Sequence, residues 1–471
     1  MSKIRNIADN IEKSVLVLGP GIYLEKDGKS FKDHTESYSQ NNDDKIMHYF
    51  GHDNLFRPKN NKSLGDIQAD FAKFYQKEFS ENVKALYKKI SQIPYSLIIS
   101  LNPDQTMITC YKELGMKEDQ YVYEFYRVGR NDLKNDTPTR DKPYLLNLLG
   151  SYTEPESLIF TYESLFAYLR NILPSKVLPA SIRTSLKEAE NISFLGVEFD
   201  KWYFQLLVQL LTESDEKYEV LRYASPDLSI EENTYCICKN NFEINFVGPD
   251  VFSFIDELYY HCSEHETNKL RGEPILNEGK VYNPKIYISY KGTGQSKKIT
   301  DLLIEQGKSI GYKMINYKSN LEFRGRTWEF MKRIGWQKYI IVVVSDEYLK
   351  SEYCMFEFKE IMRNGKKFEE RVFPIVLFTE DIYKQSNWKE YEKYWQREIR
   401  KLKTDLNGMD SERLSKSIES IKRYEEIQKS IPSMMDYLSS TNCLNSQNFE
   451  DIDLTTLFSA IKDKIDNDLN S

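Results

Sequence analysis

The chain has 471 residues, of which 40% are hydrophobic, so it is long enough for two or three domains with ordinary hydrophobic cores. With a formal net charge of −7, nothing in the composition suggests a polybasic surface, and we find no direct nucleic-acid signature. Because no apolar run reaches the length of a membrane span and the N-terminus lacks a signal-peptide core, we expect a cytoplasmic protein with no membrane partner.

The first 265 residues alternate between short apolar runs and amphipathic segments. A buried strand is predicted at 14–18, followed by a glycine-rich turn at 19–21, a polar irregular segment to residue 61 and a long helix at 63–92. Further strands are predicted at 95–102, 121–126, 144–149 and 192–196, and further helices at 162–173, 181–190 and 201–211. Such alternation is typical of an α/β fold with a parallel sheet whose faces are covered.

The cysteines are scattered, at positions 110, 236, 238, 262, 354 and 443, which is typical of a protein in a reducing cytosol. Cys236 and Cys238 lie in an alternating run, which predicts a strand with both side chains on one face. His261, Cys262 and His265 carry metal-ligating groups, but a fourth ligand at metal spacing is missing, and we predict no metal site.

The composition shifts near residue 261, and a second α/β pattern follows. Strands are predicted at 285–290, 312–316, 339–344 and 372–377, with a helix at 296–311. Beyond residue 401 the sequence predicts charged helices, clearest at 413–431 and 454–465. We therefore divide the chain into a first domain at 1–265, a linker at 266–282, a second domain at 283–400 and a helical C-terminal extension at 401–471.

The run from Ser345 to Glu357 is the most informative stretch of the chain, because it follows the buried strand predicted at 339–344. Ser351 is placed as the N-cap of a helix, and Tyr353 and Glu357 are four residues apart, so they share one face of that helix. An aromatic ring and a carboxylate would then lie near the carboxyl edge of a parallel strand, where open α/β sheets bind their ligands.

This pattern resembles the Toll/interleukin-1 receptor (TIR) domain, which has a flavodoxin-like fold, over roughly residues 283–400. The strand Lys285-Ile-Tyr-Ile-Ser-Tyr290 is similar to the family's first strand, and Arg324-Gly325-Arg326-Thr-Trp328 lies at the position of its BB loop. Many bacterial TIR domains cleave the nicotinamide–ribose bond of NAD+, and the resemblance implies this activity, with Glu357 as the catalytic carboxylate. It also implies substrate-binding roles for Tyr290, Lys291, Arg324, Arg326, Trp328, Tyr353 and Phe356.

Two positions depart from catalytic relatives, because Tyr353 stands where several have Trp and Phe356 replaces a common Tyr. They keep open a second interpretation, a non-enzymatic adaptor that signals through TIR–TIR association. Catalytic TIR domains often work only when stacked, so the resemblance also implies a homo-oligomer or filament whose activity depends on assembly.

The N-terminal domain resembles the sirtuin-like, Rossmann-type fold over roughly residues 10–260. The resemblance rests on four segments: the turn Gly19-Pro20-Gly21, the strand end Ile98-Ile-Ser-Leu-Asn102-Pro-Asp104, the segment 146–151 and the turn 194–200. The family's catalytic His would fall at Leu149, which cannot act as a general base, so we expect a catalytically inactive domain. The resemblance still implies nucleotide binding through Gly19, Gly21, Asn102 and Asp104; a scaffold or sensor without a ligand is the alternative.

Together these resemblances imply an NAD+ glycohydrolase effector of bacterial antiphage immunity. It would deplete NAD+ to nicotinamide and ADP-ribose, or to a cyclic form, in abortive infection. NAD+ is the expected substrate, and no cofactor is expected apart from a regulatory nucleotide in the sirtuin-like domain. The expected trigger is a phage component or the protein product of a neighbouring gene.

Overall fold

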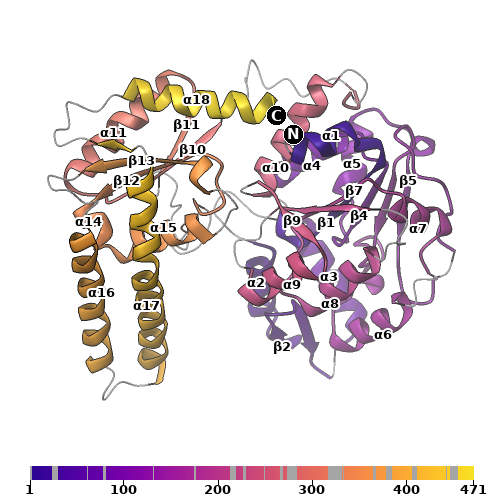
Figure 1. Ribbon diagram of the computed structural model, residues 1–471. Coiled ribbons are helices and arrows are strands. Elements are labelled where there is room, and N and C mark those ends of the chain that lie inside the picture. The colour runs from indigo at the N-terminus through magenta and orange to yellow at the C-terminus, as the bar shows by residue number, and fades with distance from the viewer. Residues whose placement is uncertain are drawn as a thin grey trace. The chain divides into compact units, whose positions relative to one another are not determined.

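The computed structural model of the protein is shown in Figure 1. It describes residues 3–23, 30–60, 62–77, 81–130, 132–173, 177–212, 219–225, 230–248, 250–265, 269–272, 284–316, 331, 334–363, 368–377, 385–405, 411–441, 443–445 and 454–470. The chain forms two compact units, Met1–Gly279 and Lys280–Ser471, and the division falls inside the segment predicted as a linker. Each unit contains a parallel sheet, which confirms the predicted α/β class with two parallel-sheet domains.

The sheet of the first unit has seven strands in the order β5-β6-β4-β1-β7-β8-β9, and each neighbouring pair is parallel. The strands are β1 (Ser14–Leu18), β4 (Leu97–Ser100), β5 (Val122–Phe125), β6 (Tyr144–Asn147), β7 (Asn191–Leu195), β8 (Leu221–Ala224) and β9 (Ile244–Phe246). The chain runs from β1 to β4 on one side and later adds β7 on the other. The strand order therefore reverses at β1, and a ligand crevice is expected at its carboxyl end.

Helices cover both faces of this sheet (Figure 1). Leu16 and Leu18 of β1 face a core that includes α1 (Lys3–Asp9), α3 (Leu64–Lys77), α4 (Glu81–Gln92), α5 (Thr106–Glu113) and α10 (Val251–Glu264). Val15 and Val17 face a second core, built with α6 (Tyr162–Ile172), α7 (Ala180–Lys187) and α8 (Trp202–Leu211). The alternation of side chains along β1 explains why an uninterrupted apolar run serves two cores.

The segment before residue 61, predicted as irregular, instead contains a helix and a hairpin. Helix α2 (Phe31–Asn41) begins with a capping box, in which the Ser30 hydroxyl accepts from the Asp33 amide and the Asp33 carboxylate accepts from the Ser30 amide. Strands β2 (Ile46–Phe50) and β3 (Leu55–Pro58) pair antiparallel. The prediction was wrong here because α2 is mostly polar and the two strands, of five and four residues, are too short for hydrophobic periodicity to show.

The prediction of a strand at Cys236 and Cys238 was also wrong. Both lie in helix α9 (Glu232–Asn240), where residues two apart point in nearly opposite directions, so Cys236 is exposed and Cys238 is buried. His261 and Cys262 lie in α10, which belongs to the first unit. Among the residues that the structure describes, no His, Cys, Asp or Glu side chains gather into a group of three or more that would hold a metal.

The sheet of the second unit has five strands in the order β11-β10-β12-β13-β14, again with parallel neighbours. They are β10 (Lys285–Tyr290), β11 (Lys313–Asn316), β12 (Ile340–Ser345), β13 (Val372–Leu377) and β14 (Leu444–Asn445). One face packs against α15 (Glu352–Arg363), α16 (Gln385–Asp405) and α17 (Ser411–Ser440), and the other against α11 (Gly294–Ser309) and α18 (Leu454–Asn470). In the described parts of the chain, no helix is both long and apolar enough to cross a membrane.

The tail beyond residue 401 contains the predicted helices, but it also contributes a strand. Helices α16 and α17 lie side by side as a long hairpin (Figure 1), and the chain then returns to the sheet as β14, next to β13. A two-residue strand is too short for hydrophobic periodicity to show, which explains why the sequence predicts helices alone.

Candidate functional site

Three elements of the second unit bring side chains together under the N-terminal half of α15. They are the inner strand β10, the short helix α14 (Asp346–Leu349) that follows β12, and α15 itself. Ser345 caps α14 by accepting a hydrogen bond from the Tyr348 amide at 3.2 Å. Helix α15 begins one residue after Ser351, as predicted, and the Met355 amide donates to the Ser351 carbonyl at 3.0 Å.

Glu357 lies on the second turn of α15 and is only 5% exposed. Its Oε2 accepts a hydrogen bond from the Ser289 hydroxyl at 2.6 Å. Burial raises the pKa of Glu357 to about 7, and the hydrogen bond from Ser289 opposes this rise. A carboxyl group with a pKa near neutral can exist in either protonation state under cellular conditions, which is common at functional sites.

Two further side chains surround this carboxyl group. The Tyr348 hydroxyl lies 2.8 Å from the Ser289 hydroxyl, and both side chains are buried. The Cys354 thiol donates to the Tyr290 carbonyl at 3.6 Å, and burial raises its pKa to about 12, with a further rise from nearby Glu357. Burial likewise raises the pKa of Tyr348 well above its ordinary value. Glu357 is therefore the group in this cluster that titrates near neutral pH.

The remaining predicted residues of this site differ in their exposure. Tyr353 is 48% exposed although it shares a helical face with buried Glu357, so the ring is open to solvent beside a covered carboxylate. Phe356 is 7% exposed, and the Lys359 ammonium lies 5.4 Å from its ring centroid. Tyr290 is buried at the end of β10.

Lys291 follows directly after β10, and its ammonium donates to the Ser351 hydroxyl at 3.3 Å. Lys291 thereby joins the carboxyl end of β10 to the start of α15. The structure thus places Tyr290 and Lys291 beside the helix that carries Glu357. Arg324, Arg326 and Trp328, predicted to bind substrate, lie outside the described residues.

Sequence reasoning missed Ser289 and Tyr348 as members of this cluster. The signal for Ser289 was present, because it is a hydroxyl at a buried position of a strand that otherwise reads as apolar. Tyr348 gave no such signal, since the four-residue helix α14 was not predicted.

Side chains of the α16–α17 hairpin contact the segment that leads into α15. The Tyr391 hydroxyl donates to Asp346 Oδ1 at 3.0 Å, and the Trp395 indole donates to the Leu349 carbonyl at 3.0 Å. Arg423 Nε lies 3.2 Å from Glu352 Oε1, at the first turn of α15. The position of α15 over the sheet is therefore fixed by the hairpin as well as by the sheet.

In the first unit, the predicted nucleotide-binding glycines pack against another backbone turn. The Gly19 and Gly21 amides donate to the Leu195 and Gly196 carbonyls, both at 2.8 Å. A Cβ atom at Gly19 would lie 2.3 Å from the Gly196 oxygen, and Gly196 itself has a φ of +67°. The close approach of two backbones explains these glycines without a ligand, and it occupies the amides that a phosphate would need.

Asn102 and Asp104 lie at the carboxyl edge of the same sheet, next to this turn. Asn102 donates to the Gly19 carbonyl at 3.1 Å, and its buried Oδ1 has no hydrogen-bond partner among the described residues. The Asp104 carboxylate accepts from the Tyr23 hydroxyl, from the Tyr87 hydroxyl at 2.9 Å and from the Thr106 amide at 2.8 Å. The structure thus brings Gly19, Asn102 and Asp104 together, while Asp104 already has internal donors. Nucleotide binding here stays a prediction.

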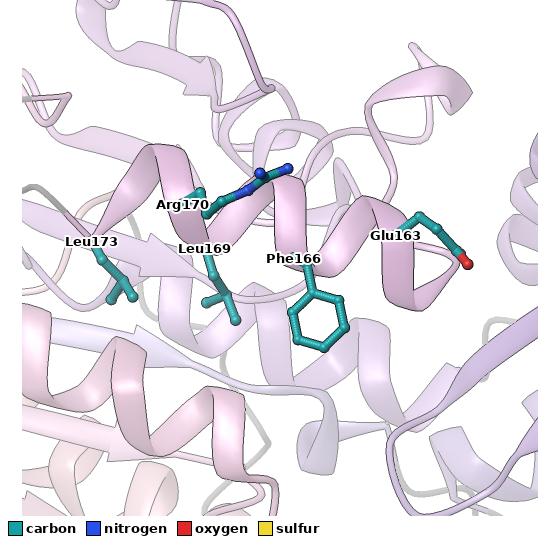
Figure 2. Close-up of a pocket in the computed structure, with 5 residues that line it drawn as sticks. All are labelled: Glu163, Phe166, Leu169, Arg170 and Leu173. Carbon is teal, nitrogen blue, oxygen red and sulfur yellow. The ribbon is translucent and has the colours of Figure 1, made fainter.

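A surface depression of about 870 Å³ lies along helix α6 of the first unit. Figure 2 shows its lining, which comes from one helix: Glu163, Phe166, Leu169, Arg170 and Leu173. None of the residues predicted to bind a nucleotide or substrate lines it.

Two family models match the chain, one in each unit. The TIR domain model matches residues 285–448, and the SIR2-like domain model matches residues 96–240. A curated relative, the TMV resistance protein N of Nicotiana glutinosa, is 26% identical over 132 residues, which are 28% of this chain but only 12% of that protein. A solved structure of the TIR domains in the activated Roq1 resistosome directly recognizing the pathogen effector XopQ is 18% identical, with a TM-score of 0.26, and the match covers 38% of this chain and 99% of that one. The chain is therefore a TIR-domain protein that carries an SIR2-like domain in its N-terminal unit.

Proposed function

We propose that the TIR domain cleaves the N-glycosidic bond between nicotinamide and ribose in NAD+, with Glu357 as the catalytic carboxylate. The observation that carries the proposal is the Glu357 carboxyl group, buried beside the carboxyl end of the inner strand β10 in a domain that matches the TIR family. The SIR2-like domain is proposed to sense the trigger rather than to catalyse, because Leu149 stands at the position of the family's catalytic His.

The reaction needs a negative charge close to the ribose. As the glycosidic bond breaks, its electron pair leaves with nicotinamide, and positive charge develops on the ribose in an oxocarbenium-like transition state. An ionised Glu357 would stabilise that charge in a site of low dielectric constant. Water then attacks the ribose carbon and gives ADP-ribose with release of a proton; attack by the adenine ring would give a cyclic product.

Neighbouring side chains suit the other parts of the substrate. The half-exposed ring of Tyr353 offers a stacking surface for a base, and Lys291 offers a positive charge near a phosphate. We propose that assembly of several chains through their TIR domains switches the activity on in the cytoplasm, as a defence against phage infection.

The test is NAD+ consumption by the full chain at high protein concentration, with products separated by chromatography. Glu357→Gln keeps the shape of the side chain and removes its charge, so turnover should fall at least 100-fold, on the order expected for loss of a transition-state charge contact. Glu347→Gln, an exposed neighbour on α14, is the matched control and should retain activity.

The adaptor interpretation makes the opposite prediction for the same variants. Phe356 lacks the hydroxyl of the Tyr that is common at this position, and Tyr353 offers less ring surface than the Trp of several catalytic relatives. Both changes would weaken contacts with NAD+, so they favour the adaptor interpretation. If the wild type leaves NAD+ intact under crowding, and Glu357→Gln associates with other TIR domains as the wild type does, the adaptor interpretation holds and the proposed activity fails.

A further inference from the structure

We propose that Ser289 and Tyr348 are positioning residues, which hold the Glu357 carboxylate in one orientation through a chain of two hydrogen bonds. The inference rests on the proposed function, because it explains how the chain prepares Glu357 for that role. Neither residue is assumed to touch the substrate.

The three side chains come from three different elements. Ser289 lies on the inner strand β10, Tyr348 on α14, and Glu357 on α15. The Ser289 hydroxyl is 2.6 Å from Glu357 Oε2 and 2.8 Å from the Tyr348 hydroxyl. Because Ser289 and Tyr348 are at most 1% exposed, water does not compete for these bonds. Because the Glu357 carboxylate is hydrogen-bonded to a residue of β10, its side chain cannot rotate freely on α15.

Counting protons gives the chain a direction when Glu357 is ionised. An ionised carboxylate only accepts, so the single proton of the Ser289 hydroxyl must point to Glu357. The oxygen of Ser289 is then left to accept, and Tyr348 must donate to it. The order is therefore Tyr348 to Ser289 to Glu357, and each bond polarises and strengthens the next. A protonated Glu357 can donate to Ser289 and reverse the order.

Among the described residues, this hydrogen-bond chain is the main support for the negative charge. The ionisable side chains described near Glu357 are Tyr348 of α14 and Cys354 of its own helix, and burial keeps both neutral at neutral pH. The ammonium of Lys291 is directed to the Ser351 hydroxyl. Removal of the Ser289 hydroxyl should therefore favour the protonated carboxyl group.

The test is a direct titration of Glu357 in the full chain. Glutamate carrying ¹³C in its side-chain carboxyl group is incorporated, and the resonance that disappears in Glu357→Gln is assigned to Glu357. In the wild type we expect a titration midpoint near 7. In Ser289→Ala the midpoint should rise by on the order of one pH unit, as expected for loss of a hydrogen bond to a charged group.

Two further variants separate positioning from a merely structural role. Tyr348→Phe keeps the buried ring and removes only its hydroxyl, so the midpoint should rise less than in Ser289→Ala. Ser289→Thr retains a hydroxyl, so its midpoint should return to the wild-type value. Ser309→Ala, on the exposed end of α11, is the control and should leave the midpoint unchanged. An unchanged midpoint in both Ser289→Ala and Tyr348→Phe would overturn the proposal.

The titration does not depend on turnover, so its outcome is independent of the proposed function. If NAD+ is consumed, the acidic limb of the pH–rate profile should move with the midpoint in each variant. If no NAD+ is consumed but the midpoints move as expected, the proposed function fails and the hydrogen-bond chain stands. If Ser289→Ala does not fold, Tyr348→Phe and Ser289→Thr decide the matter.

Discussion

The indole of Trp395 donates a hydrogen bond to the Leu349 carbonyl at 3.0 Å, joining the hairpin helix α16 to the end of α14. Leu349 lies three residues before the start of α15, which carries Glu357. The contact is buried, since Trp395 is 1% exposed. Trp395 is thus a buried link between the hairpin and the candidate site, beside the contacts of Tyr391 and Arg423.

We expect Trp395→Phe to destabilise the protein by about 2–4 kcal/mol, because it leaves the Leu349 carbonyl without its donor and a gap beside it. Urea unfolding followed by tryptophan-independent circular dichroism measures the change. Lys393→Gln, an exposed position on the same helix, should alter stability by less than about 0.5 kcal/mol. Equal stabilities for Trp395→Phe and the wild type would refute the coupling.

Stability should depend on pH through Glu357. Burial raises the pKa of Glu357 to about 7, so the folded chain keeps a proton that the unfolded chain releases at its ordinary pKa. The unfolded state therefore binds fewer protons between these values, and stability falls as the pH rises toward 7. Relative to wild type, Glu357→Gln should gain up to about 3 kcal/mol between about pH 5 and about pH 8.

Denaturant titrations of both proteins across this pH range check the expectation. Glu347→Gln, which replaces an exposed carboxylate on α14, is the control. A constant difference for Glu357→Gln would mean that its carboxyl group does not titrate in this window.

Arg371 ties the end of α15 to the loop that precedes β12. Its guanidinium donates to the Gly335 and Gln337 carbonyls, both at 2.7 Å, and to the Ile361 carbonyl at 2.6 Å. Burial lowers its pKa to about 10, which still leaves it charged at neutral pH. Arg371→Lys keeps the charge but loses the planar fork, so we expect a loss of about 2–4 kcal/mol in unfolding free energy.

A thermal unfolding scan, with Arg363→Lys on the more exposed last turn of α15 as control, measures this loss. Stability of Arg371→Lys within about 0.5 kcal/mol of wild type would show that charge alone suffices at this position.

Gly19 lies in close contact with the backbone of the turn at Gly196. A Cβ atom would lie 2.3 Å from the Gly196 oxygen, so Gly19→Ala must push two strand ends apart. We expect a loss of about 2–4 kcal/mol. Gly65→Ala is the matched control, because the nearest atom to its Cβ is 3.8 Å away and alanine suits the helix there. If Gly19→Ala unfolds at the same urea concentration as Gly65→Ala, the close approach is not needed for the fold.

Buried parallel strands were the easiest part of the structure to predict. The bounds predicted for β10 and β13 agree with the structure, because both strands are covered on two faces and read as continuous apolar runs. The helix that carries Glu357 was also predicted from local signals, a serine followed by an amphipathic stretch. These features depend on residues that are close in the sequence.

The parts that were missed depend on contacts between distant residues. Ser289 and Tyr348 are 59 positions apart, and only the pairing of β10 with β12 brings them together. The donors of Tyr23 and Tyr87 to Asp104 likewise follow from tertiary packing, since no local pattern links these residues. Hydrophobic spacing predicts elements, whereas the partners of a polar group become visible only when the elements are packed.

Although β14 has only two residues, it covers the edge of β13, and it is synthesised later than the other strands of the sheet. Ile375 and Val376 of β13 pair with Leu444 and Asn445, residues that leave the ribosome some seventy positions later. Until then β13 is an uncovered apolar edge, which can recruit strands from other chains. A nascent chain halted after the hairpin would therefore carry the whole Glu357 helix on an unfinished sheet. The sheet is complete only once residue 445 has been synthesised.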